Sequence, residues 1–187
     1  LGITVRELIS DSTLQAKGMK AVAQKTDALA AVSFMDLSVE AQCFGAKIRF
    51  YDNEVPAVEK GIIEDIEDVS DIKVPEIGLS RDAVFIESIR LAKKKITDMP
   101  VFAGVIGPFS LAGRLFDMTE IMMECYSSPD EVKILLEKAS EFITEYIKEL
   151  KKQGQTELLW LSPLRDCSPP LLTMNFQFHL SKKYSQI

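Results

Sequence analysis

The feature that most constrains this chain is an apolar hexapeptide, Val101 to Ile106, which follows Pro100 and precedes Gly107 and Pro108. Its length fits a strand that is buried on both faces, and such strands occur in parallel sheets whose faces are covered by helices. Helical spacing resumes directly after Pro108. We therefore predict a strand, a turn and a helix, which are the repeating parts of an α/β protein.

The turn after this strand is a candidate wall of a binding site. Gly107 allows backbone to come close to whatever lies above the strand end. Small or polar residues follow it, among them Ser110, and they keep the space beyond the turn open. The same pattern also occurs in α/β proteins that bind nothing at this turn, so the residues alone leave both interpretations open.

Strong helical patterns lie on either side of the strand. The run 80–98 has an apolar stripe with a 3.6-residue period, and Ser80 is its predicted N-cap. The run 130–153 has the same period, with Ser128 as predicted N-cap and Gly154 as stop. Weaker patterns predict two helices within 4–25, further helices over 38–44, 65–71 and 119–127, a strand over 27–35 and a small hairpin over 47–63.

Asp36 is the first candidate site residue, because it follows the predicted strand 27–35 and precedes the predicted helix 38–44. In α/β barrels and open α/β sheets, ligands bind at the carboxyl ends of strands. An aspartate at this place also makes a good N-cap for the next helix. The residues leave both roles open.

Composition excludes several classes of protein. With 187 residues, of which 47% are hydrophobic, the chain can build one sizeable core, and its apolar runs are far shorter than a membrane span. The net charge of −6 and the absence of a basic patch argue against nucleic acid as a partner. Its 3 cysteines form no close pair and no signal peptide precedes Leu1, so we expect a soluble protein of the reducing cytoplasm. Because position 1 is not Met, we expect that the chain was cut at its front.

Three stretches of the chain resemble a known family. They are FMDLSVEAQCFGAKIRFYDNEVPAV (34–58), VFAGVIGPFSLAGRLF (101–116) and CYSSPDEVKILLEKASEFITEYIKELKKQG (125–154). In order and spacing they resemble the N-terminal half of the uroporphyrinogen decarboxylase superfamily, and within it the methylcobamide:thiol methyltransferases. The resemblance covers most of residues 1–154. It implies an α/β fold that is the N-terminal half of a (β/α)8 TIM barrel.

The resemblance also implies site residues. Asp36 matches the aspartate that holds the pyrrole N–H groups of the substrate in the decarboxylases, and Tyr126 lines up with a tyrosine beside that substrate. A packing role for Tyr126 is the alternative. With Gly107 and Ser110, these residues form the substrate site that we predict for a small molecule. The arginine-rich motif of the decarboxylases is missing, which argues against a substrate with eight carboxylates, although that motif would lie near Leu1 or before it.

The methyltransferases of the superfamily bind zinc through a His-x-Cys pair and a later Cys, and the zinc holds a thiol as thiolate for attack on a methyl-corrinoid. The single histidine, His179, has no Cys two residues on. Cys43 and Cys125 match no family ligand and are predicted to be small core residues. The acidic run 65–71 has no His or Cys nearby and is predicted to face water. We therefore expect no metal or cofactor in this fragment, and zinc and a corrinoid in the complete enzyme.

Residues 155–187 depart from the family. Beyond 157–161 they show neither a helical nor a strand period, and Pro163, Pro169 and Pro170 interrupt them. With suitable codons, reading one base earlier yields a peptide that resembles the next strand of the family, its A-E-P turn and its L-L-S-P helix start. We therefore expect a change of reading frame near Gly154 and an irregular or loosely helical segment over 162–187.

These observations lead to one main functional hypothesis and two alternatives. The parent enzyme is expected to move a methyl group from a methyl-corrinoid protein to a zinc-bound thiol such as coenzyme M, and this fragment is expected to be inactive. The first alternative is uroporphyrinogen decarboxylase, an enzyme of porphyrin biosynthesis. The second is a module that docks a corrinoid protein without chemistry. Because half a barrel leaves a sheet edge unpaired, we also expect self-association.

Overall fold

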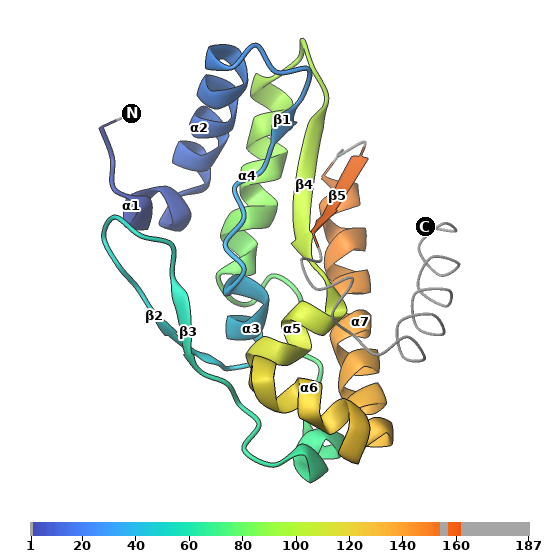
Figure 1. Ribbon diagram of the computed structural model, residues 1–187. Coiled ribbons are helices and arrows are strands. Elements are labelled where there is room, and N and C mark those ends of the chain that lie inside the picture. Colours follow the sequence, from blue (N-terminus) through green and yellow to red (C-terminus); the bar gives the residue numbers. More distant parts are fainter. Residues whose placement is uncertain (1, 154–156, 162–187) are drawn as a thin grey trace.

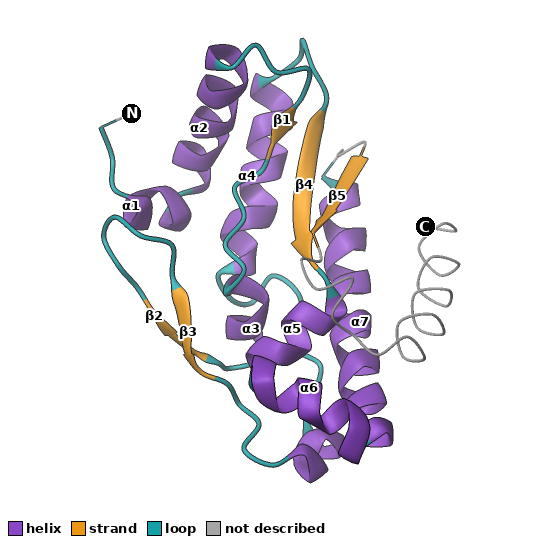
Figure 2. Ribbon diagram, viewed as in Figure 1, coloured by secondary structure: helices purple, strands orange, loops and turns teal. Residues whose placement is uncertain are grey.

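A computed structural model describes residues 2–153 and 157–161 (Figures 1 and 2). The helices are α1 (Val5–Ser10), α2 (Ser12–Lys25), α3 (Val39–Cys43), the 3-10 helix η1 (Ile66–Asp71), α4 (Asp82–Lys95), α5 (Pro108–Leu115), α6 (Met118–Ser127) and α7 (Pro129–Lys152). The strands are β1 (Ala31–Val32), β2 (Lys47–Arg49), β3 (Ala57–Lys60), β4 (Val101–Ile106) and β5 (Glu157–Leu161). Within these residues no helix is both long enough and apolar enough to cross a membrane.

The main sheet has the strand order β1-β4-β5, and both pairings are parallel. The helices α4 and α7 each pack against β4, and α2 lies along α4 (Figure 1). This arrangement of parallel strands and covering helices is the predicted α/β architecture. The sheet stays open, because in the described residues β1 and β5 each pair on one side only. The sheet in the described part of the chain therefore does not close into a barrel.

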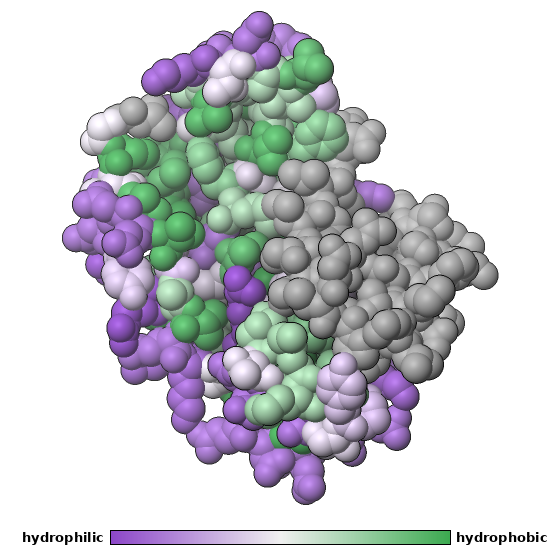
Figure 3. Space-filling view, viewed as in Figure 1, coloured by the Kyte–Doolittle hydropathy of each residue, from purple (hydrophilic) through white to green (hydrophobic). Residues whose placement is uncertain are grey.

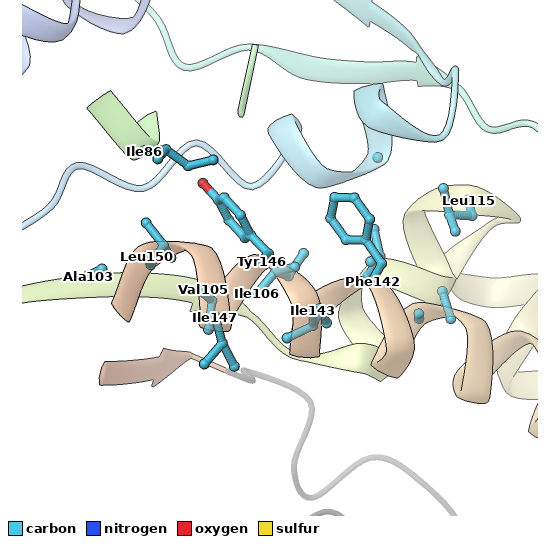
Figure 4. Packing of buried hydrophobic residues seen from close by; sticks show 14 of the residues in the cluster. Ile86, Ala103, Val105, Ile106, Leu115, Phe142, Ile143, Tyr146, Ile147 and Leu150 are labelled. Carbon is cyan, nitrogen blue, oxygen red and sulfur yellow. The ribbon is translucent and has the colours of Figure 1, made fainter. Parts of the chain in front are cut away.

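The core lies between β4 and the helices that cover it. The predicted central strand is confirmed: Val101, Ala103, Val105 and Ile106 of β4 are all buried. The apolar stripe of α7 packs against this strand, and Figure 4 shows Tyr146 of α7 pointing toward α4. Each large apolar side chain that becomes buried contributes about 1.5–3 kcal/mol. The stripe of α7, which is almost entirely buried, therefore provides much of the stability of this core.

The predicted strand 27–35 is shorter than expected. Only Ala31–Val32 forms β1, although the backbone N–H of Ser33 still donates to Phe102 O at 2.9 Å. The next amide of β4, that of Gly104, donates to the Ser33 side-chain Oγ at 2.8 Å. A side-chain acceptor thus replaces a backbone carbonyl at this point, and the regular ladder ends there.

The predicted N-cap Ser80 is wrong. Helix α4 begins at Asp82, and the Asp82 carboxylate accepts hydrogen bonds from the backbone N–H groups of Gly78 and Ser80. Ser128 does occupy the N-cap position of α7, but its side chain makes no capping hydrogen bond. The predicted stop Gly154 and the segment 162–187 lie outside the described residues. For α4 and α7 the apolar pattern predicted the helix correctly, but neither N-cap side chain makes a capping hydrogen bond.

Two further predictions are confirmed. The hairpin expected within 47–63 is the antiparallel pair β2–β3, and the acidic run 65–71 contains η1.

In the face seen in Figure 3, hydrophobic residues gather over the region of β1 and β4. Val32 of β1 is 41% exposed, so part of the apolar surface of the sheet faces solvent in this chain. Self-association through this surface remains a prediction.

We predict that Gly61→Ala destabilises the chain by about 2–3 kcal/mol, because overpacking against rigid groups has this cost. A Cβ at position 61 would lie 2.3 Å from the backbone O of Leu115, which accepts hydrogen bonds from the N–H groups of Ile62 and Ile63. Urea unfolding of the two chains measures the difference in the free energy of unfolding.

The matched control is Gly113→Ala, whose Cβ would come closest to the flexible thioether of Met118, with the Met118 Cα 3.5 Å away. We expect this control to change the free energy of unfolding by less than about 1 kcal/mol, since the thioether can move aside. Equal effects of the two substitutions on the free energy of unfolding would show that the backbone at residue 61 can move away from α5 at little cost.

Candidate functional site

The candidate site lies at the carboxyl ends of β1 and β4. Because the two strands are parallel, their carboxyl ends meet at one edge of the sheet, where ligands are bound in barrels of this class. Asp36 lies between β1 and α3, and Gly107 is the N-cap of α5, which begins immediately after β4. Figure 1 shows α3, α5, α6 and the β2–β3 hairpin gathered at this end of the sheet.

Asp36 is 4% exposed and is held by a buried network. Its Oδ1 accepts hydrogen bonds from the Ser38 backbone N–H at 3.0 Å and from Ser38 Oγ at 2.6 Å. Its Oδ2 forms an ion pair with Arg81, whose side chain is 10% exposed. Charge-assisted bonds of this kind are roughly twice as strong as neutral ones. Both carboxylate oxygens of Asp36 are therefore engaged by groups of the protein.

Arg81 connects α4 to the carboxyl end of β1. Besides Asp36, it donates to Ser38 Oγ at 2.8 Å and to Gln42 Oε1 at 2.7 Å. Its guanidinium also lies over the ring of Phe50, 5.1 Å from the centroid. Sequence reasoning missed this residue. A signal was present, because an arginine at the N-terminus of a helix opposes the helix dipole and needs another partner.

Glu40 of α3 is a second buried carboxyl group, and sequence reasoning missed it as well. Its Oε1 accepts from the backbone N–H of Ile106, the last residue of β4, at 3.4 Å. Its Oε2 has no hydrogen-bond partner among the described residues. Burial raises the pKa of Glu40 to about 7, with a smaller contribution from the Asp36 charge, while the Ile106 amide and Arg114 oppose this shift. Glu40 can therefore gain or lose a proton near neutral pH.

A pocket of about 610 Å³ opens beside this network. Its walls are the β2–β3 hairpin, the residues just before α3, and the junction of α5 with α6. Ser38 and Arg114 line it, so the pocket touches the Asp36 network on one side. A volume of this size suits a small-molecule ligand.

The structure places the four predicted site residues differently. Gly107 and Ser110 lie with Asp36 at the strand ends, and Ser110 is fully buried with an Oγ that has no partner in the described part of the chain. Tyr126 lies on α6 with 80% of its surface exposed and does not line this pocket. A shared cavity of Tyr126 and Asp36 stays a prediction.

The described residues include no group of three His, Cys, Asp or Glu side chains placed to hold a metal ion. Burial raises the pKa of the Cys43 thiol to about 12, and burial also raises the pKa of Cys125. Both groups are therefore thiols at neutral pH in this structure. Cys167 and His179 lie outside the described residues. The described part of the chain therefore does not fit a catalytic zinc.

Comparison with known proteins agrees with the architecture. The chain is 28% identical over 139 residues to the methylcobamide:CoM methyltransferase MtbA of Methanosarcina acetivorans, covering 68% of this chain and 38% of that protein. It is 27% identical over 131 residues to a uroporphyrinogen decarboxylase of Hydrogenobaculum sp., covering 67% of this chain and 36% of that protein. The chain thus spans less than half the length of these relatives.

The fold has a solved counterpart in a methyltransferase from Methanosarcina mazei, with a TM-score of 0.80 at 22% identity, over 88% of this chain and 49% of that one. This likeness supports the expected fold, a partial barrel of the (β/α)8 type. Residues 1–159 match the family described as Uroporphyrinogen decarboxylase (URO-D). The chain therefore belongs to the uroporphyrinogen decarboxylase family.

Proposed function

We propose that this chain is the N-terminal part of a methyltransferase that moves a methyl group from a methyl-corrinoid protein to a thiol such as coenzyme M. The observation that carries this proposal is the similarity to a methylcobamide:CoM methyltransferase, which is 28% identical over 139 residues. The proposed partners are a corrinoid protein and a small thiol, and the proposed compartment is the cytoplasm.

The environment of Asp36 supports this proposal over decarboxylation. In the decarboxylases, the matching aspartate is expected to accept hydrogen bonds from the pyrrole N–H groups of the substrate. Here Ser38 and Arg81 occupy three of the roughly four acceptor positions of the carboxylate. Burial to 4% exposure leaves little room for a ligand at the fourth position. We infer that Asp36 holds the start of α3 against α4 instead of binding a tetrapyrrole.

The chemistry proposed for the complete protein needs a metal that the described residues do not fit. Zinc, when bound, would hold the acceptor thiol as a thiolate. This chain spans 38% of the methyltransferase relative, so the ligands are proposed to lie in the remaining length of the complete protein. The residues of this chain would provide one wall of the substrate pocket and the buried network of Asp36 beside it.

Two alternatives are each favoured by one observation. Decarboxylation of uroporphyrinogen is favoured by the similarity to the Hydrogenobaculum enzyme. A docking module for a corrinoid protein is favoured by three exposed side chains on α6, namely Met122, Met123 and Tyr126. Methionine and aromatic side chains suit adaptable binding surfaces. Neither alternative explains the pocket and the pairing of Asp36 together.

We predict that the complete protein containing this chain demethylates methylcobalamin when coenzyme M and zinc are present. The 187-residue chain alone is expected neither to demethylate methylcobalamin nor to retain zinc. The absorbance change of methylcobalamin measures turnover, and elemental analysis of the dialysed proteins measures zinc. Release of carbon dioxide from uroporphyrinogen, without demethylation of methylcobalamin, would establish the decarboxylase instead.

We also predict that Arg81→Gln destabilises the chain by about 3–5 kcal/mol, the usual cost of leaving one charge of a buried pair without its partner. The charge left behind is that of Asp36, whose side chain is 1% exposed. Thermal and urea unfolding measure the loss. The control is Lys148→Gln, which removes the exposed pair with Glu145 and should cost less than about 1 kcal/mol.

If Asp36 instead contacts substrate, Asp36→Asn should abolish the activity of the complete protein and leave its stability unchanged. That outcome, together with a neutral Arg81→Gln, would contradict the structural role of the pair.

A further inference from the structure

The pocket beside the Asp36 network is lined by four charged side chains, and three of them already have partners. Glu59 forms ion pairs on the hairpin, one of them with Arg49 at 2.7 Å. Lys60 pairs with Glu64 at 2.5 Å. Asp117 accepts hydrogen bonds from two backbone N–H groups at the start of α6. The charges of these three groups are therefore compensated or engaged within the protein.

Arg114 is the fourth charged residue of the pocket. Its Nη1 donates to the backbone O of Ser110 at 3.2 Å, and in the described part of the chain no carboxylate lies within ion-pair distance of its guanidinium. Arg114 is half-buried, and this burial lowers its pKa, which shows that its charge is partly removed from water. A guanidinium in a pocket with most of its donors unused is well suited to bind an oxyanion through two parallel hydrogen bonds.

Two buried carboxyl groups, Glu40 and Asp36, act on the charge of Arg114 without forming an ion pair with it. The charges of Glu40 and Asp36 both raise the pKa of Arg114, in opposition to burial. Asp36 is already paired with Arg81. Glu40 keeps an unpartnered Oε2 within the described residues. Glu40 is therefore the one of the two whose charge can change without breaking an ion pair.

We propose that the pocket binds the anionic group of a small molecule, a sulfonate or a carboxylate, through Arg114, and that the buried carboxyl of Glu40 modulates this binding. The anion site follows from the pocket alone. Its assignment to the sulfonate of a thiol substrate rests on the proposed function, whereas the alternative decarboxylase would place a substrate carboxylate there.

Direct binding to the 187-residue chain tests the site without any turnover. The probe is ethanesulfonate, the neutral comparison is ethyl methyl sulfone, and the second anion is propionate, each titrated by NMR. We expect ethanesulfonate to bind and the sulfone not to bind. Arg114→Gln should weaken the binding of ethanesulfonate about tenfold or more, since a charge-assisted pair is lost.

The matched control is Lys60→Gln, which removes the other cation of the same pocket. Because Lys60 already pairs with Glu64, we expect less than about a threefold change. Circular dichroism verifies that each variant is folded. Equal binding by wild type and a folded Arg114→Gln variant would overturn the assignment, as would equal binding of the neutral sulfone. If Arg114→Gln does not fold, Arg114→Lys, which keeps the charge, provides the test: binding should weaken but persist.

The protonation state of Glu40 should make the binding of ethanesulfonate depend on pH. Because burial raises its pKa to about 7, Glu40 is mostly neutral at pH 6 and mostly charged at pH 8. A charged Glu40 repels a bound anion and attracts Arg114, so the affinity for ethanesulfonate should fall about three- to tenfold from pH 6 to pH 8. In Glu40→Gln this fall should disappear. A fall of the same size in Glu40→Gln would assign the effect to another group.

Two other groups that interact with Glu40, Tyr146 and Cys43, do not change their protonation in this interval. The pKa of Tyr146 is raised well above its ordinary value by burial, and that of Cys43 is raised to about 12. Asp36 is held in its ion pair with Arg81. The chain has 1 histidine, His179, outside the described residues, and His179→Gln is therefore a further control that should keep the full pH dependence.

The outcomes separate this inference from the proposed function. Methyl transfer by the complete protein without anion binding at Arg114 would overturn the inference only. Anion binding at Arg114 without methyl transfer would support the site and reject the methyltransferase. Tighter binding of propionate than of ethanesulfonate would support the anion site and assign it to carboxylate ligands.

Discussion

The packing of α7 against β4 is the interaction on which the rest of this structure depends. β4 is the central strand of the sheet, and its residues Val101, Ala103, Val105 and Ile106 are buried by neighbouring strands and covering helices. Because this strand cannot slide relative to α7 without exposing its apolar side chains, its carboxyl end has a defined position. The turn at Gly107 and helix α5 begin at that end, so the packing of the core fixes the positions of the site residues on them.

Buried charge is the second organising element of the molecule. Taking Asp36 and Arg81 out of water is costly, and the pair is tolerated because each of the three guanidinium nitrogens donates a hydrogen bond and both carboxylate oxygens accept one. Glu40 differs, since one of its oxygens lacks a partner in the described part of the chain and its pKa rises to about 7. The two carboxyl groups thus differ: both oxygens of Asp36 are engaged by protein groups, whereas Glu40 is able to exchange a proton near neutral pH.

The chain belongs to the uroporphyrinogen decarboxylase family, and its sheet and site correspond to about half of a barrel. The chain covers 49% of a related methyltransferase structure and reproduces its fold with a TM-score of 0.80. In a (β/α)8 barrel the residues at the carboxyl ends of the strands face the ligand. The pocket at Arg114 lies at this end and is already formed by the hairpin and by α5 and α6. This pocket is therefore already formed within the described part of the chain, which does not close into a barrel.

The sequence by itself determined the class of fold, the central strand and the main helices, because periodicity and buried apolar runs depend on local residue order. It also placed Asp36, Gly107 and Ser110 at strand ends. Only the tertiary structure decided which side chains meet. Arg81 is 45 residues from Asp36 along the chain, and Ser33 ends β1 by binding an amide of another strand. Such contacts between distant residues leave little trace in local patterns. Arg81 showed only its unfavourable place at a helix N-terminus, and the roles of Glu40 and Arg114 became visible only in the folded chain.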